Sequence, residues 1–136
     1  MSPSPPSILI VEDEVIVAAD LAGKLDQLGY RVAATTATGE QAVELARQHR
    51  PDLVLMDIRL AGAMDGIAAA AAIRRELDLP VIFLTAHSDA ATITQARQAG
   101  ASAYVRKPFD DRELRTRIDQ ALRTHGAERR RRQGGS

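Results

Sequence analysis

The chain of 136 residues contains no cysteine, which excludes disulfide bridges, thiolate zinc sites and a cysteine nucleophile. An excess of either charge is also missing, because 18 basic and 18 acidic side chains cancel. No apolar run approaches the roughly 18 residues needed to span a bilayer, and the first residues lack the charged and apolar regions of a secretory signal. We therefore expect a cytoplasmic protein that binds neither nucleic acid nor membrane, and whose metal sites use oxygen or histidine ligands.

The length and the 45% hydrophobic composition fit one domain with a single sizeable core. The opening, rich in serine and proline, predicts a disordered lead over residues 1–6. The arginine-rich ending predicts a basic, flexible tail over residues 126–136. The domain itself is expected over residues 7–125.

Short apolar runs predict the strands of a parallel sheet. Three runs are uninterrupted, as in strands covered by helices on both faces: Ile8 to Val11, Leu53 to Met56, and Val81 to Leu84. Two weaker candidates bring the number of strands to five: Arg31 to Thr35 and Ala103 to Val105.

Segments with helical spacing lie between and after these strands. They cover Val15 to Leu25, the region around Ala42 to Ala46, Ile67 to Glu76, Ala90 to Ala99, and Asp111 to Leu122. Five alternations of strand and helix, joined by right-handed crossovers, predict a doubly wound, flavodoxin-like α/β fold. In it, a five-stranded parallel sheet of order 2-1-3-4-5 carries five helices on its two faces.

Polar side chains follow the central strands, where ligands bind in open α/β sheets. Glu12 and Asp13 follow the first strand, Asp57 the third, Thr85 the fourth and Lys107 the fifth. Two carboxylates about 4 Å apart repel by about 4 kcal/mol at an effective dielectric constant near 20. A cation is needed to offset this, and Mg²⁺ suits carboxylate ligands. Cation and lysine together could stabilise a transferring phosphoryl group.

Simpler structural interpretations exist for each residue alone. Glu12 and Asp13 could be acids at the start of a helix, where the helix dipole favours negative charge. Lys107 could be a solvated loop lysine and Tyr104 a packing residue. Asp57 is harder to explain in this way, because a buried carboxylate is unfavourable unless it is paired or bound to a cation.

Four motifs, in this order, resemble the signature of response regulator receiver domains over about residues 7 to 123. They are VEDE at 11–14, LMDI at 55–58, LTA at 84–86 and KPF at 107–109. The resemblance implies that Asp57 is the phosphoacceptor of a Mg²⁺-dependent reaction, with Mn²⁺ as a substitute. Asp13 would bind the metal directly, Glu12 mainly through water, and Arg59 through its backbone carbonyl.

The same resemblance assigns roles in switching. Thr85 and Lys107 would contact the phosphoryl group, and Tyr104 would be the second switch residue. The Lys107-Pro108 peptide bond is expected to be cis. Two positions resemble those that tune the phosphoryl lifetime in this family, Arg59 and His87.

One loop departs from the family pattern. Position 61 is alanine where receivers commonly carry proline, and the pair Asp65-Gly66 comes one residue late. We therefore expect the loop at 60–66 to be longer and looser than usual, which affects the metal-binding geometry more than the acceptor.

The sequence thus favours a single-domain response regulator rather than a turnover enzyme. Its partner would be a sensor histidine kinase or a histidine phosphotransfer protein. The response would change the face of helix four, strand five and helix five, for partner binding, phosphorelay or a homodimer. Two alternatives remain open: a receiver-like module that binds partners without phosphorylation, and an aspartyl-phosphate hydrolase. The second lacks support, because Asp57-Ile58-Arg59 has no second acid two residues after the first.

Overall fold

The structure, a computed structural model, describes residues 5–60, 62–85, 94–95, 97–98 and 100–134, with side chains described as far as residue 128. Its centre is a five-stranded parallel sheet in the order β2-β1-β3-β4-β5, which confirms the predicted fold. The strands are β1 (Ser7–Val11), β2 (Arg31–Thr36), β3 (Leu53–Asp57), β4 (Val81–Thr85) and β5 (Ala103–Arg106). Each strand covers its predicted run and adds one residue, so that Asp57 and Thr85 are the last residues of their strands.

The helices between the strands are α1 (Val15–Gln27), α2 (Gly39–His49) and α3 (Gly66–Leu77), and α5 (Asp111–Gly134) follows β5. Side chains cap two of these helices: Thr38 accepts a hydrogen bond from the backbone of Gln41, and Asp65 from that of Ala68. The predicted helix over 90–99 falls largely outside the described residues, although positions 94, 95, 97 and 98 are helical.

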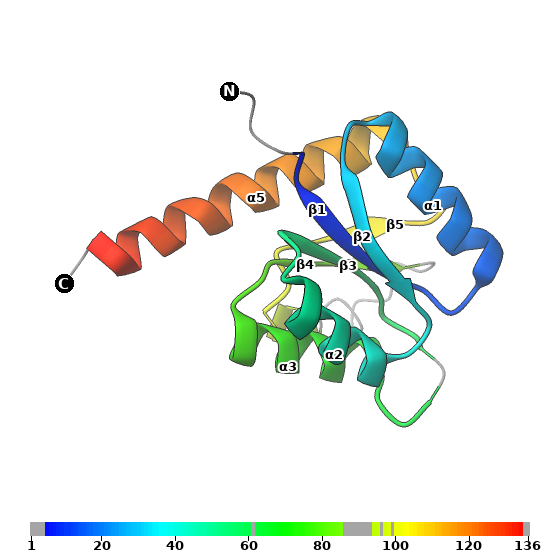
Figure 1. Cartoon of the computed structure of the whole chain (residues 1–136), viewed down its shortest axis with the longest axis horizontal. Helices are drawn as coiled ribbons and strands as arrows, with labels where there is room; N and C mark the ends of the chain where they lie inside the picture. The colour runs from blue at the N-terminus through cyan, green and yellow to red at the C-terminus, as the bar shows by residue number, and fades with distance from the viewer. Residues whose placement is uncertain (1–4, 61, 86–93, 96, 99, 135–136) are drawn as a thin grey trace.

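The structure corrects the predicted end of the last helix. α5 continues to Gly134 instead of ending near Leu122, so it covers most of the stretch expected to form a basic tail. Arginine, alanine and glutamine are good helix formers, and the charge of this segment does not oppose helix formation by itself. The side chain of His125 is also buried, which shows that packing continues beyond the predicted end. In Figure 1, α5 extends past the sheet toward the C terminus.

Alternate residues of each strand enter two different cores. Leu9 and Val11 face the cluster that includes α2 and α3, whereas Ile8 and Ile10 face the cluster that includes α1 and α5. The same alternation occurs in β3 and β4, and explains why these strands are apolar without interruption. Figure 1 shows the two helix layers on opposite sides of the sheet. None of the helices among the described residues is long and apolar enough to cross a bilayer.

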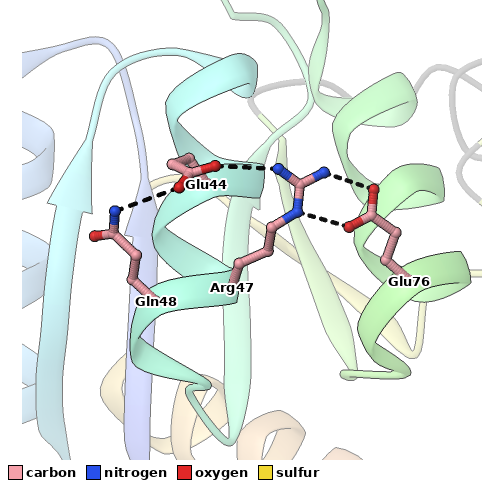
Figure 2. A network of polar contacts seen from close by, with 4 residues as sticks. All are labelled: Glu44, Arg47, Gln48 and Glu76. Carbon is pink, nitrogen blue, oxygen red and sulfur yellow. Dashed lines mark hydrogen bonds and ion pairs between the residues drawn. The ribbon is translucent and has the colours of Figure 1, made fainter.

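A network of charged side chains joins α2 to α3 on the surface. The guanidinium of Arg47 forms two hydrogen bonds of 2.7 Å with the carboxylate of Glu76, and one of 3.1 Å with Glu44 on its own helix (Figure 2). Paired geometry of this kind fixes the relative orientation of two groups more than it stabilises the fold, because exposed ion pairs are screened by solvent. The network therefore sets how the two helices face one another.

Polar contacts also attach α5 to α1 and the turn that follows it. The hydroxyl of Tyr30 donates a hydrogen bond of 2.6 Å to Asp119, and Lys24 pairs with Asp111 at 2.9 Å. Burial, together with the hydrogen bond to Asp119, raises the pKa of Tyr30 above its usual value. The phenol therefore keeps its proton and acts as a donor that holds α5 in place.

Candidate functional site

The carboxyl ends of β1 and β3 bring three acidic side chains together. Val11 pairs with Met56 in the sheet, so Glu12 and Asp57, each the next residue, lie at the same edge. Carboxylate oxygens of Glu12, Asp13 and Asp57 all lie within 4.8 Å of one another. Glu12 and Asp57 are buried and Asp13 is half-buried. The predicted cluster of acids is therefore present.

Lys107 supplies a positive charge to this cluster. Its Nζ atom lies 2.6 Å from an oxygen of Glu12 and 3.3 Å from an oxygen of Asp57. The backbone N–H of Lys107 donates a hydrogen bond of 2.8 Å to the carbonyl of Thr85, which ties the end of β5 to the end of β4. The peptide bond from Lys107 to Pro108 is cis. Four strands thus contribute to one site.

Backbone donors hold two of the carboxylates in place. The N–H of Glu14 donates to Glu12 at 3.1 Å, and the N–H of Arg59 donates to Asp57 at 3.1 Å. Each bond uses one oxygen, while Lys107 contacts the other oxygen of the same carboxylate. Such bonds fix the orientation of a carboxylate and favour its charged form.

The electrostatics of the site differ between its two buried acids. Burial, followed by the hydrogen bond and the charge of Glu12, raises the pKa of Asp57 to about 6, although Lys107 opposes this rise. Burial would also raise the pKa of Glu12, but hydrogen bonds led by that from Lys107 hold it below its usual value. For Lys107 burial acts to lower the pKa, yet bonding to Glu12 and the charge of Asp57 raise it overall. One ammonium therefore does not fully offset the negative charge at Asp57.

The donor set fits a hard divalent cation. Three carboxylates with oxygens this close together, two of them buried, are the ligands that Mg²⁺ takes in proteins, where it keeps several waters as well. No histidine joins this cluster among the described residues, and the chain has no cysteine. The donor set therefore agrees with the Mg²⁺ site that the resemblance to receiver domains implies.

Gly66, which the sequence marks only as part of the late Asp65-Gly66 pair, belongs to the site. A Cβ atom at this position would lie 2.0 Å from the carbonyl oxygen of Asp57 and 2.9 Å from Cα of Ile58. The N–H of Gly66 donates a hydrogen bond of 3.0 Å to the carbonyl of Ile58. Only glycine allows α3 to begin this close to the end of β3. Its place in an Asp-Gly pair after the acceptor strand was the signal that pointed to it.

The loop after Asp57, expected to be looser, is anchored near its end. A Cβ atom on Gly39, at the start of α2, would lie 2.9 Å from the carbonyl oxygen of Met64. Met64 therefore rests directly on α2, two residues before Gly66 closes the loop against β3. The anchoring comes from a close backbone approach that the sequence does not display.

The remaining predicted residues lie in three different settings. Thr85 ends β4 opposite Arg106, beside the attachment of Lys107. Tyr104 lies half-buried in β5 against the core that includes α2 and α3. The side chain of Arg59 is exposed, and its backbone N–H donates a hydrogen bond to Asp57. His87 lies outside the described residues.

Comparison with known proteins points to one family. The sequence profile of the response regulator receiver domain matches residues 8–119. The transcriptional regulatory protein PdtaR of Mycobacterium tuberculosis is 42% identical over 118 residues, which cover 87% of this chain and 57% of PdtaR. The chain thus spans about half the length of the curated relatives that it matches.

Solved structures give the same result. The signal receiver domain of a modulated diguanylate cyclase from Desulfovibrio desulfuricans G20 is 38% identical with a TM-score of 0.86, covering 91% of this chain and 98% of that one. The receiver domain of sensor histidine kinase PA1611 from Pseudomonas aeruginosa PAO1 is 36% identical with a TM-score of 0.78, covering 87% of this chain and 98% of that one. The latter holds a magnesium ion coordinated in its active site cleft.

Proposed function

The chain belongs to the response regulator receiver family, and on this premise we propose that it accepts a phosphoryl group on Asp57 from the phosphohistidine of a sensor histidine kinase or a histidine phosphotransfer protein. One observation carries the proposal: three carboxylates gather within 4.8 Å, and Lys107 contacts two of them. In the transfer, a carboxylate oxygen of Asp57 forms a bond to phosphorus while the phosphorus–nitrogen bond of the donor breaks. Receiver domains are generally phosphoacceptors and not turnover enzymes.

Asp13 and Asp57 are the proposed direct ligands of Mg²⁺, with the backbone carbonyl of Arg59 as a third protein ligand and Glu12 acting through water. Mn²⁺ would substitute, since it takes the same oxygen ligands. When bound, the cation supplies positive charge for the oxygens of the phosphoryl group. The raised pKa of Asp57, which burial causes first and Glu12 second, supports the need for that charge.

Lys107 is the proposed link between the phosphoryl group and β5. Its ammonium already lies 3.3 Å from Asp57, within reach of an oxygen added there. The backbone of Lys107 is bonded to Thr85, whose hydroxyl is the second proposed contact to the phosphoryl group. Tyr104 lies three residues before Lys107 and would respond as β5 adjusts. The face affected comprises β5, α5 and the predicted helix over 90–99, where a partner or a second copy would bind.

The surface beside the site supports docking of a donor protein. Val15 and Ile16, at the start of α1, are 82% and 84% exposed, and they follow Glu12 and Asp13 closely in the chain. Large apolar side chains that remain this exposed next to a reaction centre are suited to contact a partner helix. We also propose that Arg59 and His87 set how long the phosphoryl group stays on Asp57.

The test is intact-mass measurement after incubation with acetyl phosphate, with and without Mg²⁺. The wild-type chain should gain one phosphoryl group only when Mg²⁺ is present, and Asp57→Asn should gain none. Asp26→Asn is a matched control, because Asp26 is an exposed carboxylate on α1 away from the site. It should behave as the wild type.

Three results would contradict the proposal. Labelling of Asp57→Asn at the wild-type level would show that the acceptor is another residue. Absence of labelling with every donor and with either cation would favour a module that binds partners without phosphorylation. Steady turnover of an external phosphomonoester would favour a hydrolase.

A further inference from the structure

A cavity apart from the acidic site lies at the opposite end of β5 from Lys107. It has a volume of about 480 Å³, is open to solvent on the side of the exposed α5 residues, and is lined by Arg74 of α3, the residues leading into β5, and α5 from Arg117 onward. Proteins hold small molecules in cavities of roughly 300–1,000 Å³. The first residue of β5, Ala103, lines the cavity, whereas Lys107 of the phosphorylation site follows the last residue of β5. The cavity is therefore separate from the acidic site.

The lining of the cavity is strongly basic. It includes Arg74 from α3 and two arginines from α5, Arg117 and Arg123, whereas Glu128 is the only carboxylate among the described residues that line it. The excess of two positive charges is local, because the whole chain has a formal net charge of zero. Among the residues that the structure describes, none of the three arginines forms an ion pair with a carboxylate. Their guanidinium groups thus remain available to an anion from outside.

One arginine is already held in position. Arg74 donates a hydrogen bond of 3.4 Å to the carbonyl of Leu79, and its side chain is only partly exposed. Gly100, with φ of +86°, lies so close to it that a Cβ atom there would be 3.3 Å from Nε of Arg74. The side chain of Arg74 therefore lies against the residues that lead into β5, and its remaining N–H groups can donate to a ligand.

Other polar groups around the arginines suit an oxygen-rich ligand. Ser102 and Thr124 contribute hydroxyl groups and Gln120 contributes an amide. Buried His125 lies in the wall that α5 provides. This wall exists because α5 continues past Leu122, where the sequence predicts its end.

We propose that this cavity binds a small molecule that carries a phosphate group, with Arg74, Arg117 and Arg123 as its anion ligands. Guanidinium groups match phosphate oxygens in bidentate geometry, and three of them, from two helices, line this one pocket. The volume of about 480 Å³ favours a small molecule over an extended acidic segment of a partner. The proposal does not depend on phosphorylation of Asp57.

The experiment is isothermal titration of the full chain with inorganic phosphate, AMP and fructose 1,6-bisphosphate, with citrate as a phosphate-free anion. Asp57→Asn with a chelator serves as the background, so that no metal-dependent binding at the acidic site contributes. In this background the double variant Arg117→Gln/Arg123→Gln should weaken binding of the phosphate probes about ten-fold or more, since each charged hydrogen bond contributes substantially. Arg112→Gln is the matched control, because Arg112 is an exposed arginine of α5 outside the cavity.

The outcomes separate the possible ligands. Submillimolar binding of a phosphate probe that the double variant weakens, and the control retains, would support the proposal. Equal binding of citrate, or binding that Arg112→Gln weakens as much as the double variant does, would overturn it. Absence of binding by any small probe, together with binding of a polyglutamate peptide, would overturn it in favour of a protein-docking surface.

Discussion

Replacing Gly66 by alanine tests whether the acceptor strand and α3 meet as closely as the structure shows. The added Cβ atom would lie 2.0 Å from the carbonyl oxygen of Asp57 and 2.9 Å from both Cα and the carbonyl oxygen of Ile58. All three neighbours are backbone atoms, which cannot rotate away as a flexible side chain does. Either β3 or the start of α3 must move by about 1 Å to restore ordinary contact distances.

The expected loss of stability follows from two opposing effects. Forcing a methyl group into a filled space costs about 1–3 kcal/mol, and backbone neighbours place this site at the upper end of that range. Alanine in place of glycine in a helix recovers about 0.5–1 kcal/mol. A net loss of about 2 kcal/mol should lower the midpoint of urea unfolding by roughly 1 M.

Function should suffer more than stability. A displacement of about 1 Å at a reacting group can slow a reaction by about 100-fold. The Gly66→Ala variant should therefore be phosphorylated by acetyl phosphate and Mg²⁺ much more slowly than the wild type, under conditions in which both are folded. Intact mass against time gives the rate, and urea unfolding followed by circular dichroism gives the stability.

Gly23→Ala is the matched control. Gly23 lies exposed within α1, and a Cβ atom there would meet nothing within 4 Å. The free energy of unfolding of this variant should rise by about 0.5–1 kcal/mol, and the variant should be phosphorylated at the wild-type rate. If Gly66→Ala instead unfolded at the wild-type midpoint and phosphorylated normally, the close approach of α3 to Asp57 would not exist in solution.

Three further substitutions test other contacts. Lys107→Ala should still be phosphorylated but should show a much smaller change in the amide signals of β5 on phosphorylation, and an unchanged response would refute its role as the link. Burial and Asp119 raise the pKa of Tyr30, so the stability that its protonated form provides is full below about pH 10 and is lost as the pH rises further. Tyr30→Phe should therefore lose less stability than the wild type between about pH 8 and about pH 11. Urea midpoints at both pH values measure this, and an equal loss in the two proteins would contradict it. Arg47→Ala should lower the free energy of unfolding only slightly, and by even less in high salt. Strong, salt-independent coupling in a double-mutant cycle with Glu76 would refute the view that this exposed network mainly orients the helices.

The strands could be predicted because their signal is local. Residues such as Leu9 and Ile10 face different cores, so every position in β1 is apolar and the run stands out in the sequence. The end of α5 could not be predicted in this way. Its arginines resemble a solvated tail by charge, whereas burial of His125 depends on elements distant in the sequence.

The acidic site was predictable for a similar reason. Glu12 and Lys107 each follow a strand and Asp57 ends one, and parallel strands place such positions at one edge. The role of Gly66 and the basic cavity were not predictable. Both depend on distances between segments that only the packed helices define, and nothing in the local sequence of Arg74 or Arg117 distinguishes them from solvated arginines.

The length of α5 also has a mechanical consequence. From Leu122 to Gly134 the helix adds about 18 Å beyond its predicted end, at 1.5 Å per residue. Because the side chain of His125 is still buried against the domain, the last turns of the helix beyond it act as a lever arm. A tilt of about 10° at His125 would move Gly134 by about 2 Å, computed from that rise. A rearrangement of β5 too small to alter the core can thus become a displacement large enough for another molecule to detect.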